Sequence, residues 1–274
     1  MSRDRQRAAG RWFEVRGALS LRTRGVLGAT TWVLFFAVWE IASTTGLANP
    51  LLLPAPHTVI VTIVDLFVSR GFTYDVALSL WRIFVSFAIA SVVSIVLGVL
   101  MGIFTSVEAA INPFVSAWRY LPAPSFIPIL LMWFGTGELP KLALLFIGVV
   151  FFLITLIMDH TKTVKQELIE TSLTLGGSRR DVVFTVVLPA VYPSIVVAMR
   201  QMLAVSWTYL VIAEIVASTD GIGAMMMRAR RFLHTDEIMA GIVVIGVLGL
   251  LSDMAFRAFY RWQFPYLTAN AGSK

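Results

Sequence analysis

Residues 170–189 read ETSLTLGGSRRDVVFTVVLP and form a polar, charged interval between long apolar runs. Around the start of this interval, Leu168, Ser172 and Leu175 fall on one side of a helix, with acidic and hydroxyl residues near the other side. This spacing is typical of an amphipathic helix. We therefore predict a short helix that begins before residue 170 and continues into the interval.

The second half of the interval carries signals for a helix end and a new helix start. Gly176 and Gly177 are expected to stop the first helix, because glycine adopts the left-handed conformation needed just past a helix end. Ser178, followed three residues later by Asp181, predicts a relaxed capping box. Pro189 then lies early in the next apolar run.

The composition indicates a membrane protein. Of the 274 residues, 58% are hydrophobic and 14% are charged, and the mean hydropathy is +0.82. Soluble domains are about a quarter charged. The chain contains no cysteine, which excludes disulfides and thiolate metal sites. Its three histidines are scattered, so we predict no metal site, no catalytic residues and no bound cofactor.

We expect an all-α, polytopic fold with six spans, since about twenty apolar residues cross a bilayer. The predicted spans are residues 26–47, 76–103, 110–134, 142–158, 190–217 and 238–256. An arginine-rich tail (1–25) precedes the membrane domain (26–262, with a polar loop at 159–189), and a short tail (263–274) follows it. Residues 49–70 predict a proline-started amphipathic helix, too short to cross, in the outer interface.

The second span carries a small residue at every fourth position. These residues are Ser86, Ala90, Ser94, Gly98 and Gly102. Helices in lipid associate closely along such stripes, because small side chains let the backbones approach. The stripe therefore predicts a tight helix contact.

The charged residues within the predicted spans each need a partner or water. A charge near the bilayer centre costs at least about 3 kcal/mol on insertion scales. Arg82 either snorkels outward or pairs with an acid. Prolines should break the third span, so that its Arg119 either lines a pathway or anchors at the cytoplasmic interface. Arg200, Trp207 and Glu214 follow at seven-residue steps on one face, where Arg200 either binds solute or joins a structural ion pair.

Positive charge predicts the orientation. With six spans, fourteen Lys and Arg residues fall on the side of the termini and the 170–189 interval, against five on the other side. The positive-inside rule places the richer side in the cytoplasm. Three of the five exceptions, Arg228, Arg230 and Arg231, share one loop, and we expect them to meet an acidic binding protein or attract an anionic solute.

The polar interval resembles the EAA loop, E-A-A-x3-G-x9-I-x-L-P, of permease subunits from binding-protein-dependent ABC importers. Thr171 and Ser172 replace the two alanines, and Val186 replaces the isoleucine. Glutamate, glycine, leucine and proline match in register at Glu170, Gly176, Leu188 and Pro189. The segments WRYLPAPSFIPILLMWFG and WTYLVIAEIVASTDGIG are also similar to the nitrate, sulfonate and taurine branch, and the resemblance covers roughly residues 50–265.

The resemblance implies a transport subunit in a prokaryotic inner membrane, with both termini in the cytoplasm. It implies a second copy of the chain, two cytoplasmic ATPase subunits, an extracytoplasmic solute-binding protein and a small anionic solute such as a sulfonate, nitrate or taurine. The residues that would couple to the ATPase are Glu167, Leu168, Glu170, Thr171, Ser172, Leu175, Gly176 and Gly177. A translocation pathway would use Arg119, Arg200, Trp207 and Glu214. The chain has no G-x-x-x-x-G-K-[ST] motif, so ATP would be bound by the partner subunits, and no nucleic-acid partner is expected.

Two other classes of protein share some of these sequence features. A secondary transporter or channel would use broken helices and intramembrane charges equally well, but we find no inverted repeat, and the polar interval would lack a role. A membrane enzyme is disfavoured because the sequence has no HExxH, GxSxG or paired catalytic carboxylates. Uptake by the reconstituted chain without an ATPase would favour the secondary transporter.

Overall fold

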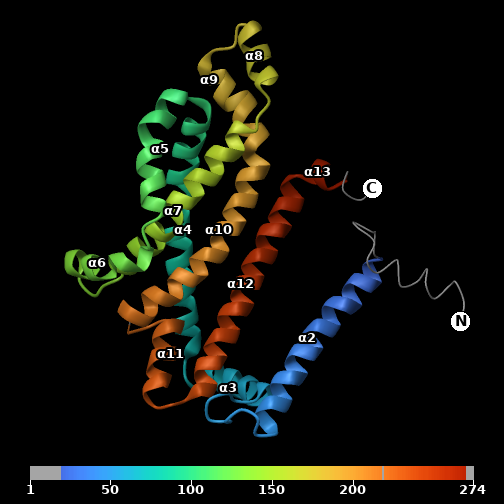
Figure 1. The fold of residues 1–274 in the computed structure, drawn as a ribbon, viewed down its shortest axis with the longest axis vertical. Coiled ribbons are helices and arrows are strands. Elements are labelled where there is room, and N and C mark those ends of the chain that lie inside the picture. Colours follow the sequence, from blue (N-terminus) through green and yellow to red (C-terminus); the bar gives the residue numbers. More distant parts are fainter. Residues whose placement is uncertain (1–19, 218, 270–274) are drawn as a thin grey trace, which may run out of the picture. The chain divides into compact units, whose positions relative to one another are not determined.

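The computed structural model describes residues 20–217 and 219–269, in which every regular element is a helix (Figure 1). The chain divides into two compact units, residues 1–60 and 61–274. The all-α, polytopic fold class predicted from the sequence is confirmed. Most of the predicted N-terminal tail, residues 1–19, lies outside the described residues.

Unit 1 contains α2 (Leu21–Thr44) and the first turn of α3 (Pro56–Ser69). Helix α2 begins earlier than the predicted span, because the Ser20 side chain caps it by accepting a hydrogen bond from the Thr23 N–H. Polar contacts close the loop that follows α2. They are Trp39 Nε1 to the Pro54 carbonyl (3.0 Å), Ser43 Oγ to the Leu53 carbonyl (2.7 Å), and His57 Nδ1 to Glu40 Oε1 (2.7 Å).

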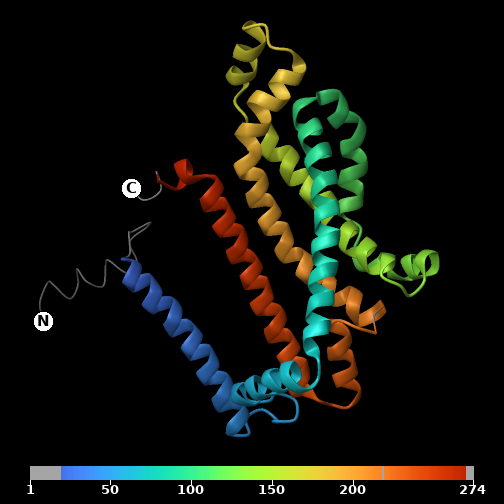
Figure 2. The same ribbon diagram turned by 180° about the vertical axis from the view of Figure 1, so that it is seen from behind.

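The core of unit 2 is built from α4 (Phe72–Ile103), α7 (Leu139–Lys162) and α10 (Leu188–Ala217). Helices α4 and α7 make the most extensive contact and lie side by side in both views (Figure 2). Fully buried residues such as Ala90, Leu153 and Leu210 come from all three helices. Helices α11 (Ile222–Arg231) and α12 (Thr235–Gln263) pack against α10.

The stripe of small residues on α4 faces α7, which confirms the predicted tight contact. Ser94 Oγ donates a hydrogen bond to the Val150 carbonyl of α7 at 3.1 Å. A methyl group at Gly98 would lie 2.8 Å from Ile157 Cβ, and one at Gly102 would lie 2.4 Å from Thr161 Cβ. Any larger side chain at these glycines would therefore push the two helices apart.

The predicted third span, residues 110–134, is broken as its prolines indicate. It is divided into α5 (Thr105–Arg119), the short η1 (Ala123–Phe126) and α6 (Ile127–Phe134). Pro122 disfavours a helical conformation at the residue before it and has no N–H to continue the ladder. By length and composition, five described helical segments can cross a membrane, and the broken segment is not one of them.

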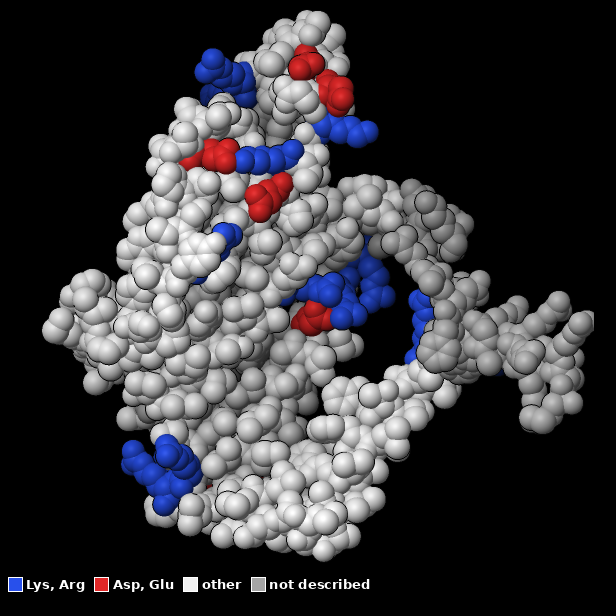
Figure 3. Space-filling model, in the orientation of Figure 1, with Lys and Arg blue, Asp and Glu red and all other residues white. Residues whose placement is uncertain are grey.

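Unit 2 carries short helices at two opposite ends. Helices α8 (Gln166–Thr174) and α9 (Arg179–Asp181) lie at one end and α11 lies at the other (Figures 1 and 2). On the face seen in Figure 3, basic side chains gather near the end that carries α11, and side chains of both charges lie over the end that carries α8 and between the two ends. The long core helices connect the two ends.

Replacing Gly102 by valine should destabilise unit 2. Overpacking a tight contact costs about 1–3 kcal/mol, and the new side chain would collide with Thr161. Thermal unfolding of the purified chain in detergent would measure the loss. Gly246→Val in α12 is the matched control, because nothing lies within 4 Å of its added methyl group. Equal melting of the Gly102 variant and wild type would contradict the contact.

Candidate coupling and pathway sites

Helix α8 protrudes at its end of unit 2 with none of its residues buried. Leu168 and Leu173 are 49% and 48% exposed, and Leu175, which caps the helix, is 83% exposed. Glu167 and Glu170 lie on the same short helix. The chain therefore leaves an apolar and acidic surface uncovered on an element that its own core does not hold.

The turn after α8 needs both glycines, for different reasons. Gly176 has φ +87°, a left-handed conformation that side chains disfavour. Gly177 donates a hydrogen bond to the Ser172 carbonyl at 2.9 Å, and a methyl group there would lie 2.7 Å from that oxygen. The predicted helix end is confirmed, and the turn tolerates no simple substitution.

A firm connection then joins the turn to α10. The predicted capping box is present: Asp181 N–H donates to Ser178 Oγ at 3.3 Å, and Ser178 N–H donates to Asp181 Oδ2 at 2.8 Å. The next six residues, Val182–Val187, form a π-helix, η2. Pro189 explains this wider turn, because its ring would collide with the carbonyl four residues earlier in an α-helix.

A hollow of about 540 Å³ lies between α8 and η2. Its lining residues are Leu168, Thr171, Ser172, Leu175, Gly177, Thr185 and Val186. Five of these seven belong to the predicted coupling set. The structure thus brings that set together around one surface.

The other end of unit 2 is organised around Arg82 of α4, whose side chain has no exposed surface. Arg82 binds Glu138 with two hydrogen bonds, Nε–Oε2 at 2.7 Å and Nη2–Oε1 at 2.8 Å. It binds Glu214 of α10 through Nη1–Oε1 at 2.6 Å. Of the two sequence expectations for Arg82, pairing with an acid is the one observed.

Glu214 is likewise fully buried and fully bonded. Besides Arg82, it accepts hydrogen bonds from Ser79 Oγ at 2.7 Å and the Gly223 N–H at 2.8 Å. The loop after α10 wraps around its carboxylate, and a methyl group at Gly221 would lie 2.4 Å from Glu214 Oε1. Glycine is required there because a side chain would occupy the place of the ion pair.

A second ion pair holds the same loop to α4. Asp75 accepts from the Gly221 N–H at 2.6 Å and from Arg228 Nη2 at 3.0 Å. Arg228 also donates to the Thr219 carbonyl. Arg230 and Arg231 are exposed and form no ion pair within residues 20–217 and 219–269. The three arginines predicted to meet a binding protein are thus in two different environments.

Glu138 connects the network to the start of α7. It also accepts from Lys141 Nζ at 2.7 Å, and Lys141 is itself buried. The hydrogen bond from Arg82 is the main cause that holds the pKa of Glu138 at about 2, below its ordinary value of 4.5. Glu138 is therefore a carboxylate at neutral pH.

The residues predicted to line a pathway do not form one cluster. Glu214 belongs to the Arg82 network. Trp207 lies between Arg200 and Glu214 along α10, and its side chain is 5% exposed. Arg200 binds Asp253 of α12, with 2.5 Å between Nε and Oδ1. Arg119 is half-buried, with its guanidinium carbon 5.6 Å from the centre of the Tyr120 ring. Asp253 was not among the residues predicted from the sequence. A lone acid within an apolar run indicates a partner on another helix and could have identified it.

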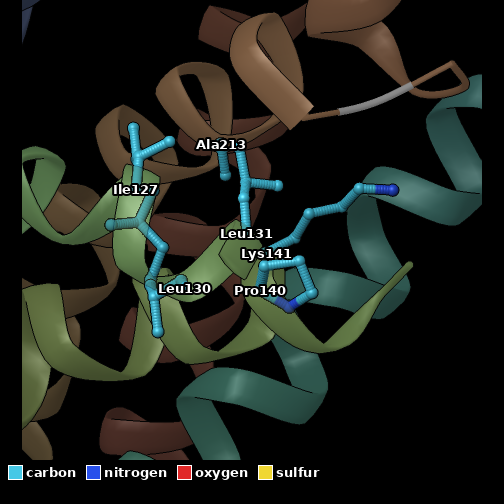
Figure 4. Close-up of a pocket in the computed structure, with 7 residues that line it drawn as sticks. Ile127, Leu130, Leu131, Pro140, Lys141 and Ala213 are labelled. Atoms are coloured by element: carbon cyan, nitrogen blue, oxygen red, sulfur yellow. The ribbon is translucent and has the colours of Figure 1, made fainter. Parts of the chain in front are cut away.

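A small apolar cavity lies where α6, α7 and α10 meet (Figure 4). Its volume of about 10 Å³ accommodates about one water molecule. Ile127, Leu130 and Ala213 line it, and Lys141 points away from these apolar side chains. The cavity is too small for an organic solute.

The fold and the two polar ends together define a helical transport subunit of the membrane. The chain belongs to the family of binding-protein-dependent transport system inner membrane components, whose model matches residues 91–268.

Relatives and solved structures agree with this family. The chain is 32% identical to the taurine transport system permease protein TauC of Escherichia coli (strain K12), over 88% of this chain and 89% of that protein. It is 28% identical to a putative aliphatic sulfonates transport permease protein SsuC of Bacillus subtilis (strain 168), over 85% and 86%. Its fold matches the inward-facing MetNI methionine ABC transporter with a TM-score of 0.59, at 18% identity, over 70% of this chain and 98% of that chain. The chain is thus a permease of the ABC importer type, not a secondary transporter.

Replacing Arg82 by methionine should strongly destabilise the chain. Two carboxylates would lose their cation, and breaking a buried ion pair costs about 3–5 kcal/mol. Denaturant unfolding in detergent would measure this loss, and adding Glu214→Gln should recover part of it. Arg261→Met is the control, because Arg261 is exposed and donates to the Arg257 carbonyl, and surface substitutions of this kind change stability by about 0.5 kcal/mol or less. Similar losses in both single variants would contradict the central role of Arg82.

The low pKa of Glu138 predicts an acid-sensitive stability. The folded-state pKa lies below the ordinary value, so the stabilisation is complete above pH 4.5 and is lost as pH falls towards 2. Melting temperatures of wild type and Glu138→Gln, measured from pH 7 down to pH 2.5, should converge over that interval. A constant difference across the whole range would refute the assignment.

Proposed function

We propose that this chain forms the pathway of an ATP-driven importer for a small sulfonate-like anion. In this proposal two copies of the chain assemble with two cytoplasmic ATPase subunits and one extracytoplasmic solute-binding protein. Crossing six times, with α5–α6 as the broken third span, the chain would place both termini and α8 in the cytoplasm. Residues 26–262 would then form the membrane domain.

The observation that carries the proposal is the uncovered surface of α8. A nine-residue helix without a buried residue gains no stability from its own core. Exposed leucines beside two glutamates suit a docking partner with an apolar groove and a basic rim. A separate ATPase subunit would supply that groove.

The connection from α8 to α10 supports a mechanical role. The glycine turn and the capping box fix the direction in which the chain leaves α8. The π-helix η2 then leads directly into α10, which carries Arg200 and, near its other end, Glu214. A push on α8 would thus move α10 as a rod, while the Arg82 network holds its far end to α4.

At the opposite end, α11 is the element that would receive the binding protein. Arg230 and Arg231 are exposed and suit an acidic surface on that protein. Arg228 would position α11 instead, because it is already bound to Asp75. In this proposal Arg228 anchors α11, and Arg230 and Arg231 recognise the binding protein.

The solute class follows from charge and from the relatives' names. Taurine and aliphatic sulfonates, named for the two relatives, carry a sulfonate group. Arg200 supplies a cation at membrane depth, and Arg119 supplies a second one at the break of the third span. Both suit an anion that passes between the helices.

Glu170→Arg and Gly176→Pro should uncouple ATP hydrolysis from uptake. The first reverses a charge on the docking face, and the second places proline at φ +87°, which its ring forbids. We expect at least a tenfold loss of ATP-dependent uptake in proteoliposomes that contain the permease, its ATPase and its binding protein, with normal membrane insertion.

Asp159→Arg is the matched control, since it makes the same charge change at an exposed position at the end of α7, outside α8. Wild-type uptake by both α8 variants would refute the docking role. ATP-independent uptake by wild type would refute the importer mechanism itself.

A further inference from the structure

One carboxylate of α12 is shared by two arginines. Asp253 Oδ1 lies 2.5 Å from Arg200 Nε of α10, and Asp253 Oδ2 lies 2.7 Å from Arg257 Nη2, one turn further along α12. Arg257 Nε also donates to the same oxygen at 2.7 Å. The group has two positive charges and one negative charge. It therefore has a surplus of positive charge.

Arg200 and Asp253 lie within the predicted spans 190–217 and 238–256, and Arg257 lies one residue beyond the second of these spans. Asp253 is ten residues before the end of α12 at Gln263, which is about 15 Å at 1.5 Å per residue. Arg200 lies well inside α10. A cation at the depth of Arg200 is costly, so it faces an acid, water or another anion. The side chains of Arg200, Asp253 and Arg257 are 37%, 28% and 55% exposed, and remain accessible to a ligand.

A further donor lies on the same contact between α10 and α12. Trp207 is two turns from Arg200, and its indole faces Gly249, which is one turn from Asp253. The Trp207 Nε1–H is buried and has no hydrogen-bond partner in the described part of the chain. Buried donors are almost always bonded, so this orphan, about 10 Å along α10 from Arg200, is a donor whose partner is still to be found.

We propose that Arg200 and Arg257 form a binding station for an oxyanion, with Asp253 as a built-in counter-ion that the arriving anion replaces. Trp207 would donate to the anion as it moves along the same contact. This inference rests on the proposed import of an anion, and it assigns the ligand to named residues of the permease. Arginine suits this ligand class, because its planar N–H groups match pairs of oxygens on sulfonate, carbonate or phosphate.

The arrangement is unlike a purely structural ion pair. One arginine would be enough to neutralise Asp253, just as the single carboxylate of Glu108 neutralises Lys162. Here the second arginine leaves both guanidinium groups with unused donors around a single acid. Among residues 20–217 and 219–269, Arg261, one turn after Arg257, forms a hydrogen bond only with the Arg257 carbonyl. It therefore provides a matched control on the same helix.

The test measures binding of ethanesulfonate to the full-length permease in nanodiscs of phosphatidylcholine, by calorimetric titration in gluconate buffer. We expect saturable binding that weakens at least tenfold in Arg200→Gln and Arg257→Gln and is unchanged in Arg261→Gln. Asp253→Asn should bind at least fivefold more tightly, because the competing carboxylate is gone. A misfolded variant would not gain affinity, so this result separates the proposal from a loss of fold.

A lipid phosphate has the same oxyanion chemistry as the solute. Repeating the titration with phosphatidylglycerol added, and counting retained phosphatidylglycerol by native mass spectrometry, distinguishes the two sources. Ethanesulfonate binding in both lipids assigns the station to the solute, whereas Arg200-dependent retention of phosphatidylglycerol alone assigns it to a headgroup.

The station is overturned if neither anion binds, or if Asp253→Asn gains nothing and Arg261→Gln loses as much as Arg257→Gln. ATP-dependent uptake that still requires Glu170 would then leave the importer function intact. If uptake no longer required ATP and Glu170 while anion binding at Arg200 and Arg257 was unchanged, the importer mechanism alone would be refuted.

Discussion

A guanidinium without exposed surface, placed between two carboxylates, sets the arrangement of unit 2. Arg82 could not remain charged inside a membrane domain unless acids from other segments met it. Glu138 comes from the start of α7 and Glu214 from the end of α10, so neutralising one residue fixes three core helices at one end. The loop from Gly221 to Gly223 then closes over the carboxylate and sets the position of α11.

The end of unit 2 that contains Arg82 is held by buried ion pairs, whereas α8 at the opposite end has no buried residue. In lipid, burial of apolar surface does not drive helices together, so α4 and α7 associate through small residues and close backbones. That contact continues to Gly102 and Thr161, near the end that carries α8. Helix α10 is tied to α4 at Glu214, whereas at its other end it continues through η2 to an unburied helix. In the proposed mechanism, a displacement of α8 would be transmitted along α10 to the Arg82 network.

Local features of this fold were readable from the sequence, and long-range pairings were not. The glycine turn after α8, the capping box at Ser178 and the break before Ala123 follow from backbone preferences of single residues. The sequence also indicates that Arg82 needs an acid, but several acids were available. The pairing with Glu138 and Glu214, at separations of 56 and 132 residues, depends on how the helices pack. The seven-residue steps placed Arg200 and Glu214 on one face, yet the two residues have different partners.

The two charged groups of unit 2 differ in their balance, and that difference separates structural from functional charge. The Arg82 network and the neighbouring Asp75–Arg228 pair join three cations, Arg82, Lys141 and Arg228, to three carboxylates, Asp75, Glu138 and Glu214. Such a neutral group satisfies its members and offers little attraction to an anion. The Asp253 group has two arginines and one aspartate, so its net positive charge would still attract an anion. An anionic solute that reached this group would exchange its hydration for hydrogen bonds to the arginines and would displace Asp253 from them. When Asp253 bound the arginines again, it would favour release of the solute. In this proposal a single aspartate would limit how tightly the pathway holds its cargo, and weak holding is what a transporter needs in order to release its solute.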